Sequence, residues 1–315
     1  MVLHMISQGK GYGKTILFGE HFVVYGLPAI ASALGTATVA TVETADEYAL
    51  VDDRPATPSY KKEKYDEQLE SNKLILAEMG LDMQKSPVTI TLAGDLIAAS
   101  GVGASAASAT AIARALNGYF DMGYDEARIN EVAYEGEKGY HGKPSGLDNT
   151  ASVYGGIIWF IKDLEGGPNT MERLKMPNPV EIVLGNTGIT SSTKEVVGDV
   201  KIKKEEKPER FDDIFSTYEK TAIKARQVLQ EGDMKTVGRL MTKTHGLLQD
   251  ITVSSRENDF LVDVAMDNGA LGAKLTGTGR GGLVQALTPG KELQDRVARA
   301  MEAEGYAAYK TLIGI

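Results

Sequence analysis

The chain has 315 residues and contains no cysteine. Disulfide bonds and cysteine-ligated metals are therefore excluded. Histidine is also scarce, and no pair among His4, His21, His141 and His245 has the spacing of a zinc-binding helix. The sequence gives no support for a zinc enzyme or for a fold held together by disulfides.

Long apolar runs and an excess of positive charge are missing as well. No apolar stretch is long enough to cross a membrane, and the first residues lack the basic region and apolar core of a signal peptide. The formal net charge of -9 argues against a nucleic-acid surface. We therefore expect a soluble, cytoplasmic protein with no membrane partner and no nucleic-acid partner.

What is present is the mixture of helical and strand patterns typical of an α+β protein. The expected helices cover residues 65–79, 105–119, 125–138, 211–230, 234–249, 258–268 and 291–304. The expected strands cover residues 14–17, 21–25, 36–43, 88–92, 157–161, 180–184, 271–276, 282–287 and 307–312. The charged run at residues 201–210 is interpreted as a solvated connection. The order of elements predicts two lobes that divide near residues 165–190.

The stretch from Ser100 to Ala107 is rich in small residues and follows an expected strand. It leads directly into the expected helix at residues 105–119. Strand, glycine turn and helix in this order bring unpaired backbone N–H groups and the positive helix end together, which favours an anion, and most naturally a phosphate. The alternative is a loop that needs glycine only for packing.

Three further segments carry unusual residues. Residues 13–21 read G-K-T-I-L-F-G-E-H, residues 141–148 read H-G-K-P-S-G-L-D, and residues 274–282 read K-L-T-G-T-G-R-G-G. Together with the glycine loop, these segments resemble the motifs of the GHMP kinase superfamily, in the family's order and across the whole chain. Four positions depart from the family pattern and bear on nucleotide affinity: Tyr12, Ala98, Ala104 and Arg280.

The resemblance implies the two-lobed GHMP kinase fold. The N-terminal lobe, residues 1–175, would be the ATP-binding domain and resemble ribosomal protein S5 domain 2. The C-terminal lobe, residues 176–315, would be ferredoxin-like, with the active site in the cleft between the lobes. Dimers are common among the relatives, so the resemblance is compatible with a homodimer.

The implied activity is transfer of the γ-phosphoryl group of ATP to the 5-hydroxyl of (R)-mevalonate, a step of isoprenoid biosynthesis. The string at residues 141–148 and the Glu20-His21 pair favour this acceptor. One alternative is a related small-molecule kinase that acts on phosphomevalonate or homoserine. Another is a non-catalytic family member that binds ATP and a metabolite to regulate a partner, but such a protein should have lost its base or its metal ligands.

The resemblance also assigns the nucleotide and metal contacts. The loop Ser100, Gly101, Val102, Gly103, Ala104, Ser105, Ala106 and Ala107 would cradle the ATP phosphates with its backbone N–H groups. Ser105 and Glu137 would hold Mg²⁺, which prefers oxygen ligands. From the residues alone, Ser105 could equally cap a helix, and Glu137 could lie on a solvated helix face.

The catalytic and substrate contacts come from the same resemblance. Asp148 would be the general base for the substrate hydroxyl, and Lys14 beside it would favour the ionised carboxylate and stabilise the charge that develops. Lys14, Glu20, His21 and Asp148 would bind the substrate, with His21 as a neutral donor. The alternatives are a helix-capping aspartate, an edge-strand lysine and a buried core histidine. For Arg280, a phosphate contact and a surface position stay open.

Overall fold

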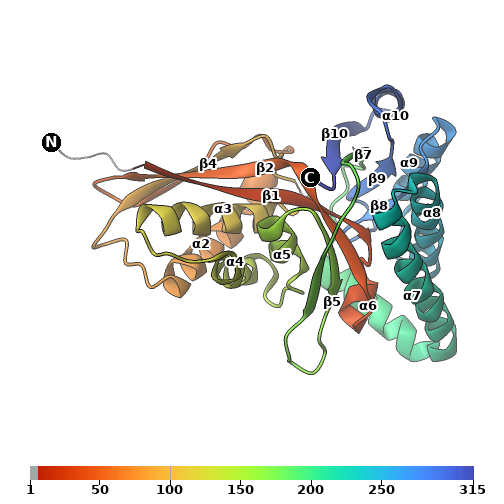
Figure 1. Cartoon of the computed structure of the whole chain (residues 1–315), viewed down its shortest axis with the longest axis horizontal. Coiled ribbons are helices and arrows are strands. Elements are labelled where there is room, and N and C mark those ends of the chain that lie inside the picture. The colour runs from red at the N-terminus through yellow and green to blue at the C-terminus, as the bar shows by residue number, and fades with distance from the viewer. Residues whose placement is uncertain (1–5, 100) are drawn as a thin grey trace. The chain divides into compact units, whose positions relative to one another are not determined.

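The computed structural model describes residues 6–99 and 101–315, and these residues fall into two compact units (Figure 1). The first unit contains the chain up to Lys14 together with Ala33–Gly155, and the second contains Thr15–Ser32 together with Gly156–Ile315. The division therefore falls inside two long strands, β1 (Ile6–Phe18) and β2 (Ala29–Thr44). These units do not correspond to one division after residue 175. Residues 15–32 and 156–175 both pack with the C-terminal part. That domain boundary of the family stays a prediction.

The first unit packs helices against strands. After β1 its elements are the distal part of β2, β3 (Ala49–Asp52), α1 (Tyr60–Glu63), α2 (Tyr65–Glu78), β4 (Val88–Gly94), α3 (Ala104–Tyr119), α4 (Glu126–His141) and α5 (Leu147–Tyr154). Strand β4 pairs antiparallel with β2, from Thr44 opposite Val88 to Thr38 opposite Gly94, and parallel with β3. Val88, Ile90 and Leu92 are buried, as the alternation of the sequence predicts for a strand with one covered face.

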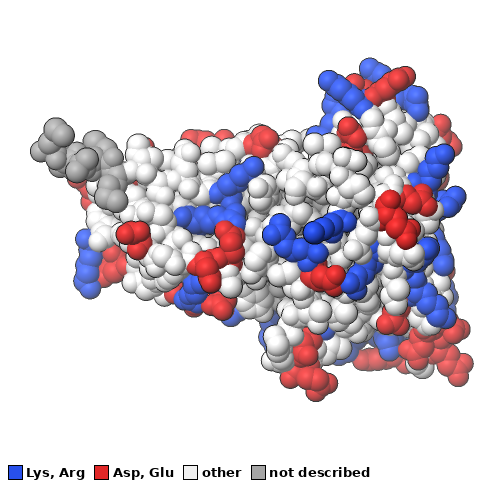
Figure 2. All heavy atoms as spheres, viewed as in Figure 1, with Lys and Arg blue, Asp and Glu red and all other residues white. Residues whose placement is uncertain are grey.

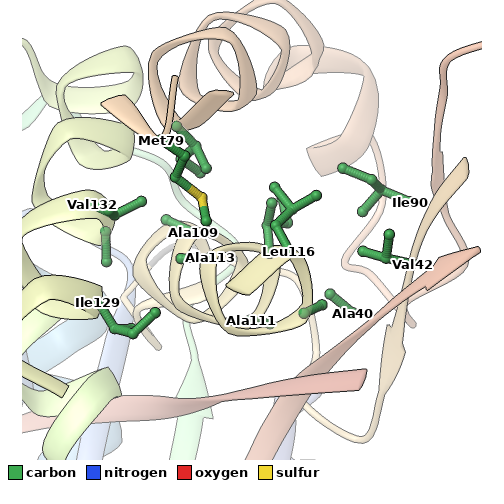
Figure 3. Packing of buried hydrophobic residues seen from close by; sticks show 14 of the residues in the cluster. Ala40, Val42, Met79, Ile90, Ala109, Ala111, Ala113, Leu116, Ile129 and Val132 are labelled. Carbon is green, nitrogen blue, oxygen red and sulfur yellow. The ribbon is translucent and has the colours of Figure 1, made fainter. Parts of the chain in front are cut away.

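Helix α3 lies at the centre of this unit's core. Its first ten residues, Ala104–Ala113, are all buried, and most are alanine or serine. Small side chains let neighbouring elements approach closely, and larger residues from those elements fill the space. Figure 3 shows Ala109 near Met79, and Leu116 beside Ile90 and Val42. The small, apolar residues that predict a helix here also explain why α3 is buried.

The second unit is built on an antiparallel sheet. After η1 (Phe22–Tyr25) and the first residues of β2, its elements are β5 (Ile157–Ile161), β6 (Thr170–Leu174), β7 (Val180–Asn186), α6 (Thr193–Glu206), α7 (Pro208–Glu231), α8 (Met234–Asp250), α9 (Arg256–Asp267), β8 (Gly272–Thr276), β9 (Leu283–Leu287), α10 (Lys291–Ala303) and β10 (Ala307–Ile313). The strand order is β10-β7-β9-β8, with antiparallel pairing throughout. Helices α9 and α10 share a buried core with this sheet. The α+β class is confirmed.

Two sequence-based expectations about local structure are wrong. Residues 21–25 are not a strand, because residues 22–25 form the 3-10 helix η1, closed by Gly26 in the left-handed region at φ 76°. A four-residue apolar run cannot tell a strand from a helical turn. The charged run at residues 201–210 is not a connection but spans the end of α6 and the start of α7.

No helix in the described part of the chain combines the length and the apolar character that a bilayer span requires. On the face shown in Figure 2, basic and acidic side chains are interspersed among uncharged residues.

Helix α8 and strand β8 approach at a contact between two glycines, which generates a stability prediction. A Cβ on Gly238 would lie 2.1 Å from the Leu271 carbonyl oxygen, whereas a Cβ on Gly246 of the same helix would meet nothing within 4 Å. Gly238→Ala should therefore lower the free energy of unfolding by about 2 kcal/mol or more through overpacking. Gly246→Ala should raise it by about 0.5–1 kcal/mol through helix propensity. Urea unfolding of both variants checks this, and equal effects would contradict the packing shown here.

Candidate active site

The loop before α3 has the geometry of an anion site. Gly101 and Gly103 have φ angles of 93° and 69°, in the left-handed region that glycine adopts at little cost. Gly103 is the N-cap of α3, and no side chain caps the helix. The first backbone N–H groups of a helix have no intrahelical acceptor, so this end can bind a negative group. Val102 and the residues from Ala104 to Ala107 are buried, and Ser100 lies outside the described residues.

Lys14 packs directly against this loop. Its backbone N–H donates to the Val102 carbonyl over 2.8 Å. A Cβ on Gly103 would lie 2.6 Å from Cγ of Lys14, so only glycine leaves room for the lysine stem. The side chain of Lys14 is 4% exposed and ends 3.0 Å from Oδ2 of Asp148. The sequence expectation that Lys14 lies beside Asp148 therefore describes the structure.

Asp148 comes from the first turn of α5, after Gly146 in the left-handed region. Its side chain is 28% exposed, whereas the ammonium group that it pairs with is covered. The pair thus offers a carboxylate that a small molecule can reach, backed by a fixed positive charge. This arrangement can accept a proton from a bound hydroxyl and stabilise negative charge beside it.

Glu137 is a buried carboxylate near the end of α4. Neither of its side-chain oxygens has a hydrogen-bond partner of good geometry in the described part of the chain. Burial raises the pKa of Glu137 to about 8, and the negative charge of Asp148 adds to the rise. The neighbouring Ser105 hydroxyl and the Lys14 ammonium partly oppose it. A solvated helix face is excluded for this residue, because its side chain is 1% exposed.

His141 lies one turn after Glu137, with Nε2 3.8 Å from Oε2 of that residue. Burial lowers the pKa of His141, although the negative charge of Asp148 acts in the opposite direction. A neutral imidazole therefore stands beside the buried carboxyl group at neutral pH. Lys14, Ser105, Glu137 and Asp148 form one neighbourhood in the first unit, as the predicted metal and base assignments require.

Glu20 and His21 belong to the second unit, where their surroundings can be described separately. The Glu20 carboxylate accepts a hydrogen bond from Nζ of Lys274 on β8, and both side chains are 0% exposed. Nζ also donates to the Leu275 carbonyl over 2.7 Å. Burial lowers the pKa of Lys274, while the Glu20 charge opposes that shift. The described environment of Glu20 is an ion pair inside the protein, and its predicted substrate contact stays a prediction.

His21 forms a hydrogen bond to the backbone inside the second unit. Its Nε2 lies 2.6 Å from the Thr278 carbonyl oxygen, which can only accept. Burial lowers the pKa of His21, so the ring is neutral and its single proton sits on Nε2. The buried Nδ1, which has no partner among the described residues, is then an acceptor. The predicted contact of His21 with the substrate stays a prediction.

Three residues with clear structural roles were not assigned from the sequence. Lys274 neutralises Glu20, and its only sequence signal is a lysine inside the otherwise uncharged strand G-A-K-L-T. Arg54 and Asp52 form a buried pair close to the first turn of α3. Nothing in the sequence pointed to this pair, because three charged residues followed by two prolines are typical of a surface loop. Arg280, left open above, pairs with Asp199 on α6 over 2.6 Å.

Comparisons with known proteins show which family the chain resembles. The family description "GHMP kinases N terminal domain" matches residues 70–156, and "GHMP kinases C terminal" matches residues 225–307. A mevalonate kinase of Pyrococcus abyssi is 33% identical over 93% of this chain and 91% of its own length. The mevalonate kinase of Pyrococcus horikoshii is 32% identical over 97% and 94%.

Among solved structures, the L. major mevalonate kinase in complex with R-mevalonate has a TM-score of 0.94 and is 36% identical, covering 98% of this chain and 96% of that one. The Methanococcus jannaschii mevalonate kinase, with a TM-score of 0.79 and 24% identity, shares the fold. The chain belongs to the GHMP kinase family, whose members are ATP-dependent phosphotransferases. The relatives named here are, within that family, mevalonate kinases.

The buried Glu137 generates a prediction about pH. The unfolded chain releases its proton near pH 4.5, whereas the folded chain holds it up to about pH 8, so the free energy of unfolding falls as the pH rises between these values. Glu137→Gln removes this loss. We expect the difference in the free energy of unfolding, variant minus wild type, to rise by at least about 1.4 kcal/mol from pH 4.5 to pH 8.5. This is the free energy that corresponds to one pKa unit.

The measurement is urea unfolding at both pH values, without nucleotide or metal. Glu131→Gln on the same helix, with a side chain that is 64% exposed, controls for the loss of a surface carboxylate. A stability difference between Glu137→Gln and wild type that does not change with pH would refute the buried protonated state.

Proposed function

We propose that this GHMP kinase transfers the γ-phosphoryl group of ATP to the 5-hydroxyl of (R)-mevalonate. The observation that carries the proposal is the ion pair of 3.0 Å between the covered Lys14 and the accessible Asp148, packed against the glycine loop. The substrate class is supported by relatives 32–33% identical that are named mevalonate kinases, and by the L. major enzyme with R-mevalonate bound.

The nucleotide would bind with its phosphates at the start of α3. The described residues from Gly101 to Ala107 supply backbone N–H groups and the positive helix end, and they leave space without large side chains. Binding there would place the γ-phosphoryl group near Lys14, whose stem packs on Gly103. Phosphoryl transfer depends mainly on such positioning and on charge neutralisation.

Magnesium fits the residues beside this loop. The two oxygens of Glu137 are buried without good hydrogen bonds, and a hard cation is the ligand that satisfies such a group. Ser105 supplies a hydroxyl oxygen next to it. We assign Glu137 and Ser105 as the protein ligands of a nucleotide-bound Mg²⁺, which would neutralise phosphate charge when bound. Binding requires that Glu137 release its proton.

Asp148 is the proposed general base and Lys14 the proposed catalytic cation. The carboxylate would take the proton from the substrate hydroxyl while that oxygen attacks the γ-phosphorus. The Lys14 ammonium, held at the same carboxylate, would stabilise charge on the reacting oxygens. A non-catalytic family member has no need for these groups, and all four of Lys14, Ser105, Glu137 and Asp148 are present.

Replacing the base tests the mechanism. Asp148→Asn keeps the side-chain shape but cannot accept the proton, so kcat should fall about 100-fold or more while mevalonate still binds. Asp125→Asn is the matched control, because Asp125 caps the neighbouring helix α4 and asparagine caps as well. Coupled ADP-release assays measure both variants. A kcat of Asp148→Asn close to that of wild type removes Asp148 from the mechanism.

The acceptor is tested by a substrate panel. Homoserine brings an ammonium group that needs a carboxylate besides Asp148, and Glu20 is already paired with Lys274. Phosphomevalonate needs additional cations, and the only arginine in the motif segments, Arg280, pairs with Asp199. We expect kcat/KM for mevalonate to exceed those for both compounds by at least about 100-fold, since unmatched charges are costly to bury. Comparable turnover of either compound would overturn the acceptor and leave the kinase assignment standing.

A further inference from the structure

A buried arginine contacts the first turn of α3 from the side of β3. Arg54 follows β3 by two residues and is 3% exposed. It carries none of the roles assigned above, and guanidinium groups are always charged. Burying a permanently charged group costs free energy, which an opposite charge and good hydrogen bonds have to offset.

One side of the guanidinium is locked by Asp52. Nε donates to Oδ1 over 2.9 Å, and Nη2 donates to Oδ2 over 2.6 Å, which is the bidentate arrangement that fixes arginine orientation. Gln68 on α2 donates to the same carboxylate over 2.9 Å. Burial alone would raise the pKa of Asp52, but the hydrogen bonds and charge of Arg54 outweigh it, and the pKa is lowered. The pair is therefore rigid and ionised.

The other side of the guanidinium reaches the peptide that precedes Ser105. Nη1 donates to the Ala104 carbonyl oxygen over 3.2 Å and to Oγ of Ser108. The Ser108 hydroxyl in turn donates to the same carbonyl over 2.8 Å. Two donors outside the backbone thus fix one carbonyl in the first turn of α3.

That carbonyl shares a peptide plane with the Ser105 N–H. In a trans peptide the C=O and N–H bonds point in opposite directions, so fixing the carbonyl fixes the amide. Ser105 is the second residue of the helix, and its N–H is among those that lack an intrahelical acceptor. A cation on the carbonyl also polarises the peptide and strengthens the N–H as a donor to an anion.

We propose that Arg54 is a positioning residue for nucleotide binding. It holds and polarises the Ala104–Ser105 peptide so that the peptide N–H donates a hydrogen bond to a phosphate oxygen. This inference rests on the proposed kinase function. Four of the five N–H donors of Arg54 are engaged by Asp52, Ala104 and Ser108, so its effect on the phosphate passes through the peptide. Loss of the Arg54 side chain should weaken nucleotide binding and leave the binding of mevalonate unchanged.

The test compares Arg54→Met, Arg54→Lys and Arg114→Met. Arg114 lies on α3 itself and also donates to backbone carbonyls, those of Lys10 and Val153, but it lies in the second half of the helix, away from the first turn. Calorimetric titration with Mg·AMPPNP gives Kd without any acceptor, and steady-state kinetics give both KM values.

Arg54→Met should raise Kd and the KM for ATP at least about tenfold, the loss expected for a charge-assisted hydrogen bond, with the KM for mevalonate within about twofold of wild type. Arg54→Lys should recover part of the affinity, and Arg114→Met should bind within about twofold of wild type. Unchanged affinity in a folded Arg54→Met, or equal losses in Arg54→Met and Arg114→Met, would overturn the proposal.

Should Arg54→Met fail to fold, Ser108→Ala and Arg54→Lys decide. Ser108→Ala removes one of the two donors to the Ala104 carbonyl and should raise the Kd for Mg·AMPPNP about threefold. Wild-type affinity in both Ser108→Ala and Arg54→Lys would contradict the proposal. A wild-type protein that binds Mg·AMPPNP without phosphorylating mevalonate would refute the acceptor alone. A wild-type protein that does not bind the nucleotide would refute both.

Discussion

The contact between Lys14 and Asp148 is the interaction on which the arrangement of the first unit's site depends. It joins β1 to α5, and the stem of the lysine fills the space that the missing Cβ of Gly103 leaves free. One side chain thus sets the distance between a strand, a glycine loop and a short helix. The loop gains its rigidity from neighbours on both sides, with Lys14 on one and Arg54 on the other.

Glu20 and Glu137 are buried in contrasting surroundings. Glu20 forms an ion pair with a lysine inside the same unit, so its charge is compensated in the folded protein. Among the described residues no cation forms a hydrogen bond with Glu137, and burial makes its ionised form costly. A compensated carboxylate stabilises and orients its surroundings, whereas an uncompensated one stores free energy that a cation can release. This contrast is the physical reason for proposing Glu137, and not Glu20, as a ligand of a cation.

Much of the fold could be predicted from local patterns in the sequence, whereas the site residues were predicted from the resemblance to a family. The alanine-rich run after the glycine loop predicts a buried helix, and the motifs at residues 13–21 and 141–148 brought Lys14 and Asp148 together correctly. Three features could not be predicted. Residues 22–25 have no periodicity that separates a strand from a 3-10 turn. The proton of His21 is placed by a carbonyl 257 residues away, and Lys274 and Arg54 act through partners that only tertiary packing supplies.

The division of the chain has a consequence for how the protein is made. Residues 15–32 leave the ribosome early, but they pack with Gly156–Ile315, and Glu20 meets Lys274 only after 254 further residues have been synthesised. Until then the Glu20 carboxylate has to stay hydrated, while Ala33–Gly155 has already emerged in full. Contacts of such large sequence separation form slowly, because a long loop must close before they contribute. Vectorial synthesis thus makes most of the first unit available for folding before the partners of residues 15–32 have been synthesised.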